Sequence, residues 1–242
     1  MKGRFRLKRF SITALLLILT MSILSGCLYP DEELSQNQIP YETQVKAVQE
    51  AVETYQKDNS GLLPIKTRDQ DTPIYQKYPI DFRKLSPRYL PEIPGNAFEN
   101  GGIFQYVLVN VEENPEVKIF DLRMAEQIRE LKIRIQAQDY PPFKKEVANN
   151  VYTLNYKELG YDEEVYVNSP YSNKNLPLVI NGDGDIYVDY SMDLFEKLKS
   201  GDKKYKNGED IRNLLVKDTY FVPAYSLPYT VDENNEPVFM TK

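Results

Sequence analysis

The sequence predicts an α+β fold of two or three units, in each of which an amphipathic helix precedes an antiparallel β-hairpin. Three observations support this fold class. Apolar residues recur three and four positions apart in 41–59, 121–138 and 191–199, a spacing typical of helices with one buried face. Paired short segments rich in β-branched and aromatic residues follow, separated by turn residues. Helices alternating with hairpins favour antiparallel sheets.

The first unit, residues 41–120, begins with a helix whose end is marked by Asn59, Ser60 and Gly61. Its predicted buried face consists of Val45, Val48, Val52 and Tyr55. The stretch that follows is rich in proline and tyrosine and is predicted to be a loop. Alternating β-forming residues then predict a hairpin, with strands at 103–111 and 117–120 and a turn at 112–116.

The second unit, residues 121–190, repeats this order. Asp121 is a suitable N-cap for a helix that runs to about residue 138. Its apolar face consists of Leu122, Ala125, Ile128, Leu131 and Ile135. A second hairpin is predicted from its strands at 176–180 and 185–189 and its Gly-rich turn at 181–184.

The third unit, residues 191–242, is shorter, with a helix at 191–199 and a last hairpin around 227–236. Segments of the units resemble one another: 152–159 resembles 78–85, and 227–236 parallels 176–185. These similarities indicate tandem repeats. The alternative is chance, because leucine, proline, tyrosine and aspartate recur throughout these stretches.

The first unit also resembles a known family. Its helix ends in Tyr55 and 58–61 (Asp-Asn-Ser-Gly), and Leu85, Tyr89 and Pro94 precede the predicted hairpin. This arrangement over 41–120 resembles the globular part of pilins and pseudopilins. The resemblance implies a shared fold for this unit only, since those proteins keep a long N-terminal hydrophobic helix for assembly and this chain has an export signal in its place.

Residues 1–26 have the layout of a signal peptide. Five basic residues precede an uninterrupted, mostly apolar run at 10–24, and the small residues Ser25 and Gly26 follow. The next residue, Cys27, is the single cysteine of the chain. The alternative is an uncleaved transmembrane helix over 10–28, which is about long enough to span a bilayer.

The stretch Leu24-Ser25-Gly26-Cys27 resembles the lipobox of bacterial lipoproteins. That resemblance implies cleavage between Gly26 and Cys27, with S-diacylglycerol and N-acyl (palmitate-type) modification of Cys27. Two or three acyl chains anchor a protein stably. The polar, proline-bounded stretch 27–40 then serves as a tether. We therefore expect a lipid-anchored protein on the extracytoplasmic face of the cell membrane.

Composition excludes several classes of function. Removing the five positive charges of residues 1–26 takes the net charge from −6 to −11, so phosphate backbones are repelled and no nucleic-acid partner is expected. The chain has no histidine and no tryptophan, which excludes histidine-based triads and histidine-ligated metals. No cofactor is expected, and the protein is not expected to be an enzyme.

Two groups of residues are candidate sites. Asn181, Asp183, Asp185 and Asp189 have part of the spacing of a calcium loop, but Ile186 and Met192 replace its glycine and glutamate. The alternative is a hairpin turn with solvated acids. Five tyrosines near several amides can form a binding surface or serve as ordinary core residues; they are Tyr152, Tyr156, Tyr161, Tyr166 and Tyr171.

The expected function is a non-catalytic binding or accessory role in the cell envelope, with an envelope protein as partner. The first alternative is a solute- or glycan-binding lipoprotein associated with transport. The second is a cell-wall enzyme that uses carboxylates such as Asp162, Glu163 and Glu164.

Overall fold

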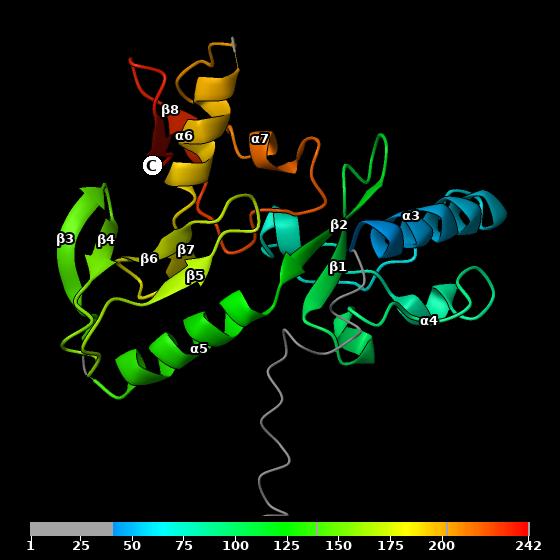
Figure 1. The fold of residues 1–242 in the computed structure, drawn as a ribbon, viewed down its shortest axis with the longest axis horizontal. Helices are drawn as coiled ribbons and strands as arrows, with labels where there is room; N and C mark the ends of the chain where they lie inside the picture. Colours follow the sequence, from blue (N-terminus) through cyan, green and yellow to red (C-terminus); the bar gives the residue numbers. More distant parts are fainter. Residues whose placement is uncertain (1–40, 139, 202, 242) are drawn as a thin grey trace, which may run out of the picture.

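A computed structural model describes residues 41–138, 140–201 and 203–241 (Figure 1). The predictions for 1–40, namely the signal peptide, lipidation of Cys27 and the tether, lie outside these residues. The fold is α+β, as the sequence predicts: helices pack against antiparallel sheets. No helix within the described ranges combines the length and the hydropathy that crossing a bilayer requires.

The first helix and the first hairpin form as predicted. α3 (Tyr41–Asp58) buries Val45, Val48 and Val52 and packs against the hairpin of β1 (Phe104–Val109) and β2 (Glu116–Asp121). The helix ends where Ser60 (φ 55°) and Gly61 (φ 87°) adopt left-handed backbone conformations. Three short helical turns lie between α3 and β1: η2 (Ile74–Gln76), α4 (Phe82–Leu85) and η3 (Phe98–Asn100).

The β1–β2 hairpin gains a partner on each of its outer edges. Next to β1, the Ile80 N–H donates to the Tyr106 carbonyl at 3.0 Å. Next to β2, the Ile119 N–H donates to the Tyr220 carbonyl at 2.8 Å, and Ile119 accepts in turn from Val222 at 3.1 Å. A segment near the C-terminus therefore completes the first sheet. We call residues 216–226 the closing segment.

A five-stranded sheet forms the centre of the second part, with α5 (Arg123–Gln136) packed on it. The predicted second hairpin corresponds to β6 (Asn175–Asn181) and β7 (Ile186–Val188). Three further strands of this sheet were not predicted from the sequence patterns: β4 (Val151–Leu154) and β5 (Tyr166–Asn168), which pair with β6, and β3 (Phe143–Ala148), which pairs with β4. Most β3 side chains are exposed, so this strand has no alternating apolar pattern.

The start of α5 differs from the prediction in one detail. The residue that flanks the helix as N-cap is Leu122, which has no capping side chain. The Asp121 carboxylate nevertheless accepts the Arg123 backbone N–H at 2.8 Å and also binds the Arg123 guanidinium. Asp121 therefore accepts a hydrogen bond from the first turn of the helix although it lies one residue before the N-cap position and not at it.

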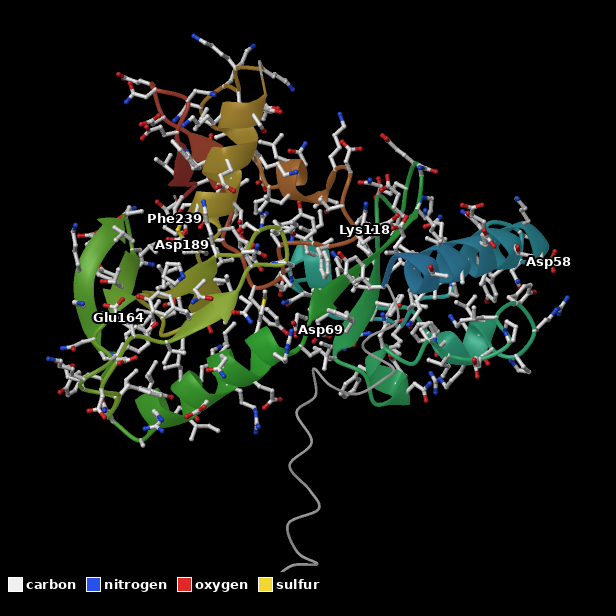
Figure 2. The ribbon with its side chains drawn as sticks, in the orientation of Figure 1. Asp58, Asp69, Lys118, Glu164, Asp189 and Phe239 are labelled. Carbon is white, nitrogen blue, oxygen red and sulfur yellow. The ribbon has the colours of Figure 1, made fainter. Side chains whose placement is uncertain are left out.

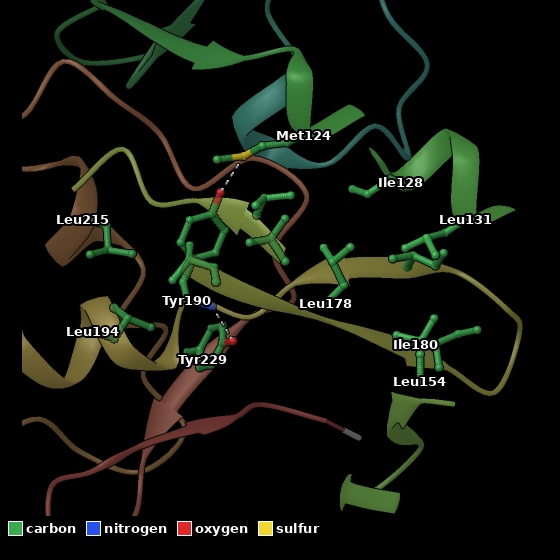
Figure 3. Close-up of a cluster of buried hydrophobic side chains, with 14 of the residues drawn as sticks. Met124, Ile128, Leu131, Leu154, Leu178, Ile180, Tyr190, Leu194, Leu215 and Tyr229 are labelled. Carbon is green, nitrogen blue, oxygen red and sulfur yellow. Dashed lines mark hydrogen bonds between the residues drawn. The ribbon is translucent and has the colours of Figure 1, made fainter. Parts of the chain in front are cut away.

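The C-terminal part contains α6 (Ser191–Ser200), α7 (Asn213–Val216) and a hairpin of β8 (Tyr229–Val231) and β9 (Pro237–Phe239). The helix and the hairpin agree with the prediction. Their apolar residues join α5 and the five-stranded sheet in one core (Figure 3). In this core the Tyr190 N–H donates to the Tyr229 hydroxyl at 3.0 Å, and the Tyr229 hydroxyl donates to Asp189 at 2.7 Å.

The similar segments 78–85 and 152–159 have similar backbones. Each begins extended beside a strand and then turns through a short helical or turn segment. Corresponding apolar residues are buried, such as Leu85 and Leu159. This agreement is local, and a true duplication of the units stays a prediction.

Candidate binding groove

Two adjoining hollows of about 510 and 700 Å³ form one groove on the described chain. Ile74, Val109 and Asn110 line both hollows and therefore join them. The first hollow is completed by the β1–β2 turn, and the second by residues 203–218 around α7. Three segments distant in the sequence thus build one groove.

The floor of the groove is part of the hydrophobic interior. Val109 and Val216 belong to a buried cluster between the β1–β2 hairpin and the closing segment, together with Val107, Phe120, Val222 and Ala224. Because this cluster holds the two sides together, the floor of the groove is preformed rather than made on binding. Ile74 contrasts with it, since 58% of its surface is exposed.

One wall is fixed by an arginine. Arg212 is buried, and its guanidinium binds Asp210 (Nη2 to Oδ2, 2.7 Å) and the Ser226 carbonyl (3.1 Å). The same guanidinium lies 5.2 Å from the centre of the Tyr75 ring, in cation–π contact. Burial raises the pKa of Tyr75 to about 12, so this side chain is a neutral phenol at physiological pH.

Lys118 fixes the position of the closing segment on β2 (Figure 2). Its Nζ donates to the Thr219 carbonyl at 2.7 Å and to the Val216 carbonyl at 3.1 Å, and it pairs with Glu116 at 3.1 Å. The lysine is 7% exposed, so these carbonyls have little access to water as an alternative partner. Nearby, Asn110 (φ 52°) and Asp218 (φ 57°) line the groove with left-handed backbones.

The charged residues of the groove differ between its two ends. Glu112 and Glu113 are exposed in the β1–β2 turn and line the first hollow. Lys203 and Lys217 are exposed and line the second. None of these four side chains forms a salt bridge within the described residues. Amides from Asn110 and Asn213 supply hydrogen-bonding groups between them.

Three of the four side chains of the predicted calcium site have other partners. The Asn181 side-chain oxygen accepts the backbone N–H groups of Asp183 (3.1 Å) and Asp185 (2.8 Å). Asp185 pairs with Lys132 at 2.8 Å. Asp189, beyond the far end of β7, accepts from Ser191 and Tyr229. Over the described ranges, no three His, Cys, Asp or Glu residues are grouped so that they could hold a metal ion.

The five tyrosines of the predicted binding surface occupy different environments. Tyr156 is buried, and its hydroxyl donates to the Val165 carbonyl at 3.1 Å. Tyr161 packs edge-on against Tyr156 and donates to Glu130 at 2.9 Å. Burial raises the pKa of Tyr156 and of Tyr161 above the ordinary value. These two residues therefore contact each other, mainly as part of the core.

The other three tyrosines lie apart. Tyr152 packs against the Phe143 ring in the β3–β4 hairpin, with ring centres 4.5 Å apart. Tyr171 packs between two cores, against Tyr190 and Phe221, and its hydroxyl is buried. Tyr166 is 45% exposed. Its role in binding stays a prediction.

Asp162, Glu163 and Glu164, the candidate carboxylates of a cell-wall enzyme, lie on the surface. Glu164 accepts from the Lys144 ammonium (3.0 Å) and from the Tyr166 hydroxyl (2.9 Å). These hydrogen bonds, the lysine first, lower the pKa of Glu164. An ionised carboxylate on the surface is poorly suited to act as a general acid. The groove residues instead offer binding contacts.

Residues 41–121 match the family described as the YphF family N-terminal domain. The matched stretch runs from the start of α3 to the end of β2 and covers less than half of the chain. No curated protein and no solved structure matches the chain significantly. The resemblance of 41–120 to pilin and pseudopilin domains stays a prediction.

Proposed function

We propose that the protein is a lipid-anchored bacterial envelope protein whose domain binds a partner protein, without catalysis, through the groove. The lipobox-like stretch ending at Cys27 supports the anchor. The observation that carries the binding role is that Ile74, Val109 and Asn110 join two hollows into one groove. Two joined hollows offer contacts to successive residues of an extended stretch of polypeptide.

The lining suits a polypeptide. Apolar side chains from Ile74, Val109 and Leu214 can contact apolar side chains of a partner, and the amides of Asn110 and Asn213 can pair with its backbone. Charged groups of both signs at the edges resemble the polar rim of protein interfaces. An exposed isoleucine in a concave site is a natural anchor point for such a partner.

A glycan is the second candidate occupant. Tyr75, Tyr78 and Tyr205 line the two hollows, and tyrosine rings with nearby amides can contact sugar rings. A glycan would bind mainly through these rings, whereas a polypeptide would also need the aliphatic surface of Ile74.

Site-specific photocrosslinking in living cells tests the proposal. A photoreactive amino acid at Ile74 is expected to capture one dominant envelope protein. The matched control is Leu62, an exposed aliphatic residue outside the groove (66% exposed, against 58% for Ile74). Equal crosslinking at both positions, or none at Ile74, overturns the proposed site.

Two variants complete the test. Ile74→Glu is expected to abolish co-purification of the captured partner, while Leu62→Glu leaves it unchanged. Tyr205→Ala distinguishes a glycan from a polypeptide, because loss of this ring should weaken the binding of a glycan more than the binding of a polypeptide. For the anchor, Cys27→Ala is expected to prevent lipidation and cleavage, so the lipid mass disappears and residues 1–26 stay attached. A mature mass that is unchanged in the variant would contradict the lipid anchor.

A further inference from the structure

The two ends of the groove carry an excess of opposite charge. At the β1–β2 turn, Glu112 and Glu113 are exposed without a salt bridge to any described residue. At the α7 end, the same holds for Lys203 and Lys217. Ile74 and Val109 lie between the two pairs, because they line both hollows.

The remaining charges of the groove leave this polarity in place. At the acidic end, Lys77 adds one positive charge, which leaves the two acids in excess; its Nζ donates to the neutral Gln70 carbonyl at 3.0 Å. At the basic end, Asp218 is a single acid beside two lysines. Two further acids there already have partners: Glu116 pairs with Lys118 at 3.1 Å, and Asp210 with Arg212 at 2.7 Å.

We infer that the groove selects a dipolar segment of polypeptide, with basic side chains at one end, apolar side chains in the middle and acidic side chains at the other end. The basic end lies against Glu112 and Glu113, and the acidic end against Lys203 and Lys217. The apolar middle packs against Ile74 and Val109. This inference rests on the proposed function and adds the sequence pattern of the partner.

The size of the effect follows from the exposure of these charges. Exposed ion pairs are individually weak, at about threefold in affinity each, and they are screened by salt. Replacing attraction by repulsion at one end of the groove affects two charges, so we expect roughly a tenfold loss of affinity at low salt. The preference should shrink as the salt concentration rises.

Three synthetic peptides of equal length, with blocked termini and the same apolar middle, test the inference against the full chain in detergent. One has two lysines at one end and two glutamates at the other; the second has glutamates at both ends; the third has lysines at both ends. Fluorescence anisotropy is expected to give roughly tenfold tighter binding of the dipolar peptide. Equal affinities, or no binding of any peptide, overturn the inference.

Charge-reversal variants locate the effect. Glu112→Lys with Glu113→Lys is expected to shift the preference to the all-acidic peptide, and Lys203→Glu with Lys217→Glu to the all-basic one. The control is Glu50→Lys with Glu53→Lys, which makes the same charge change on the exposed side of α3. An equal shift with the control contradicts a groove-specific effect. If Ile74 crosslinks a partner while the peptides show no preference, the charge pattern fails and the proposed function stands.

Discussion

Asn181 and Asp232 build the same turn in two different hairpins. The Asn181 side-chain oxygen accepts the N–H groups two and four residues later, from Asp183 and Asp185. Asp232 does the same with Asn234 (2.9 Å) and Glu236 (2.8 Å). The strand registers agree as well, since Ile180 pairs with Ile186 in one hairpin and Val231 with Pro237 in the other.

This equivalence predicts that the two turn residues are interchangeable. Asn181→Asp and Asp232→Asn keep an oxygen acceptor in place, so each is expected to change the free energy of unfolding by less than about 0.5 kcal/mol. Asn181→Ala and Asp232→Ala leave two N–H groups without their acceptor and should cost about 1–2 kcal/mol each. Urea denaturation measures both sets. Equal losses in the exchange and alanine variants would contradict the role of the oxygen.

The same turn predicts the response to metal. Three of the four candidate calcium ligands already have partners: Asn181 accepts backbone N–H groups, Asp185 pairs with Lys132, and Asp189 accepts from Tyr229. Adding millimolar calcium, or removing it with a chelator, is therefore expected to shift the Tm by less than about 1 °C. A clear rise in Tm with calcium, lost in Asp183→Ala, would support the calcium hypothesis instead.

Lys118→Met is expected to loosen the closing segment. The variant keeps the aliphatic length but removes the donor from the carbonyls of Val216 and Thr219. Buried carbonyls without a donor cost about 1–3 kcal/mol, which should appear as a lower urea midpoint. The control is Lys132→Met, which removes an exposed ion pair with Asp185 and should cost less than about 1 kcal/mol. Similar losses in both variants would show that Lys118 does not hold the segment.

Gly102→Ala is expected to strain the first unit. A Cβ atom at Gly102 would lie 2.1–2.5 Å from backbone atoms of Asn96, which cannot move without disturbing the hydrogen bond from the Phe104 N–H to the Asn96 carbonyl. The expected cost is about 3 kcal/mol. At Gly182 the nearest atom is the end of the Asn150 side chain, so Gly182→Ala should cost only about 1 kcal/mol. Thermal unfolding compares the two, and a larger loss at Gly182 would contradict the packing argument.

Buried tyrosines make the protein sensitive to alkali. Burial raises the pKa of Tyr75 to about 12, and burial also raises the pKa of Tyr190 and of Tyr229 well above the ordinary value of 10.0. Above pH 10 the unfolded chain loses these phenolic protons while the folded chain keeps them, so the free energy of unfolding falls as the pH rises toward 12.

Ultraviolet titration measures this effect. These phenols should ionise late and together with the loss of circular dichroism, whereas they ionise near pH 10 in urea. Tyr229→Phe should remove part of the alkaline sensitivity and also lower stability at neutral pH, because its hydroxyl bonds to Asp189 and to the Tyr190 N–H. A single smooth titration of all tyrosines in the folded protein would contradict the burial argument.

The elements that the sequence predicts well have strong local patterns. α3 follows from the spacing of Val45, Val48 and Val52, and the β6–β7 hairpin from its Gly-rich turn. β3 was not predicted because Lys144, Lys145 and Glu146 are three consecutive charged residues, so apolar and polar residues do not alternate along the strand. The exposed edge is instead characterised by lysines and register shifts, which discourage pairing with other chains.

The groove could not be predicted from the sequence. Ile74, Val109 and Asn213 lie in three separate segments, and none belongs to a motif. Their proximity depends on the contact of the closing segment with β2, which local patterns do not encode. Ile74 does not stand out in the sequence, because Ile65, Ile80 and Ile93 lie in the same proline- and tyrosine-rich stretch, and its exposure is known only from the fold.

The contact of Ile119 with Tyr220 and Val222 also sets the order in which this protein can mature. One edge of β2 pairs with β1, and the other edge pairs with the closing segment. β2 ends at residue 121, whereas Tyr220 lies almost one hundred residues later. During synthesis the ribosome therefore releases the helix and hairpin of the first unit long before the sheet can be completed. Until then one edge of β2 remains open to incorrect pairing. The part of the domain that is made first is consequently among the last to be finished, because its sheet is complete only once the closing segment has been made.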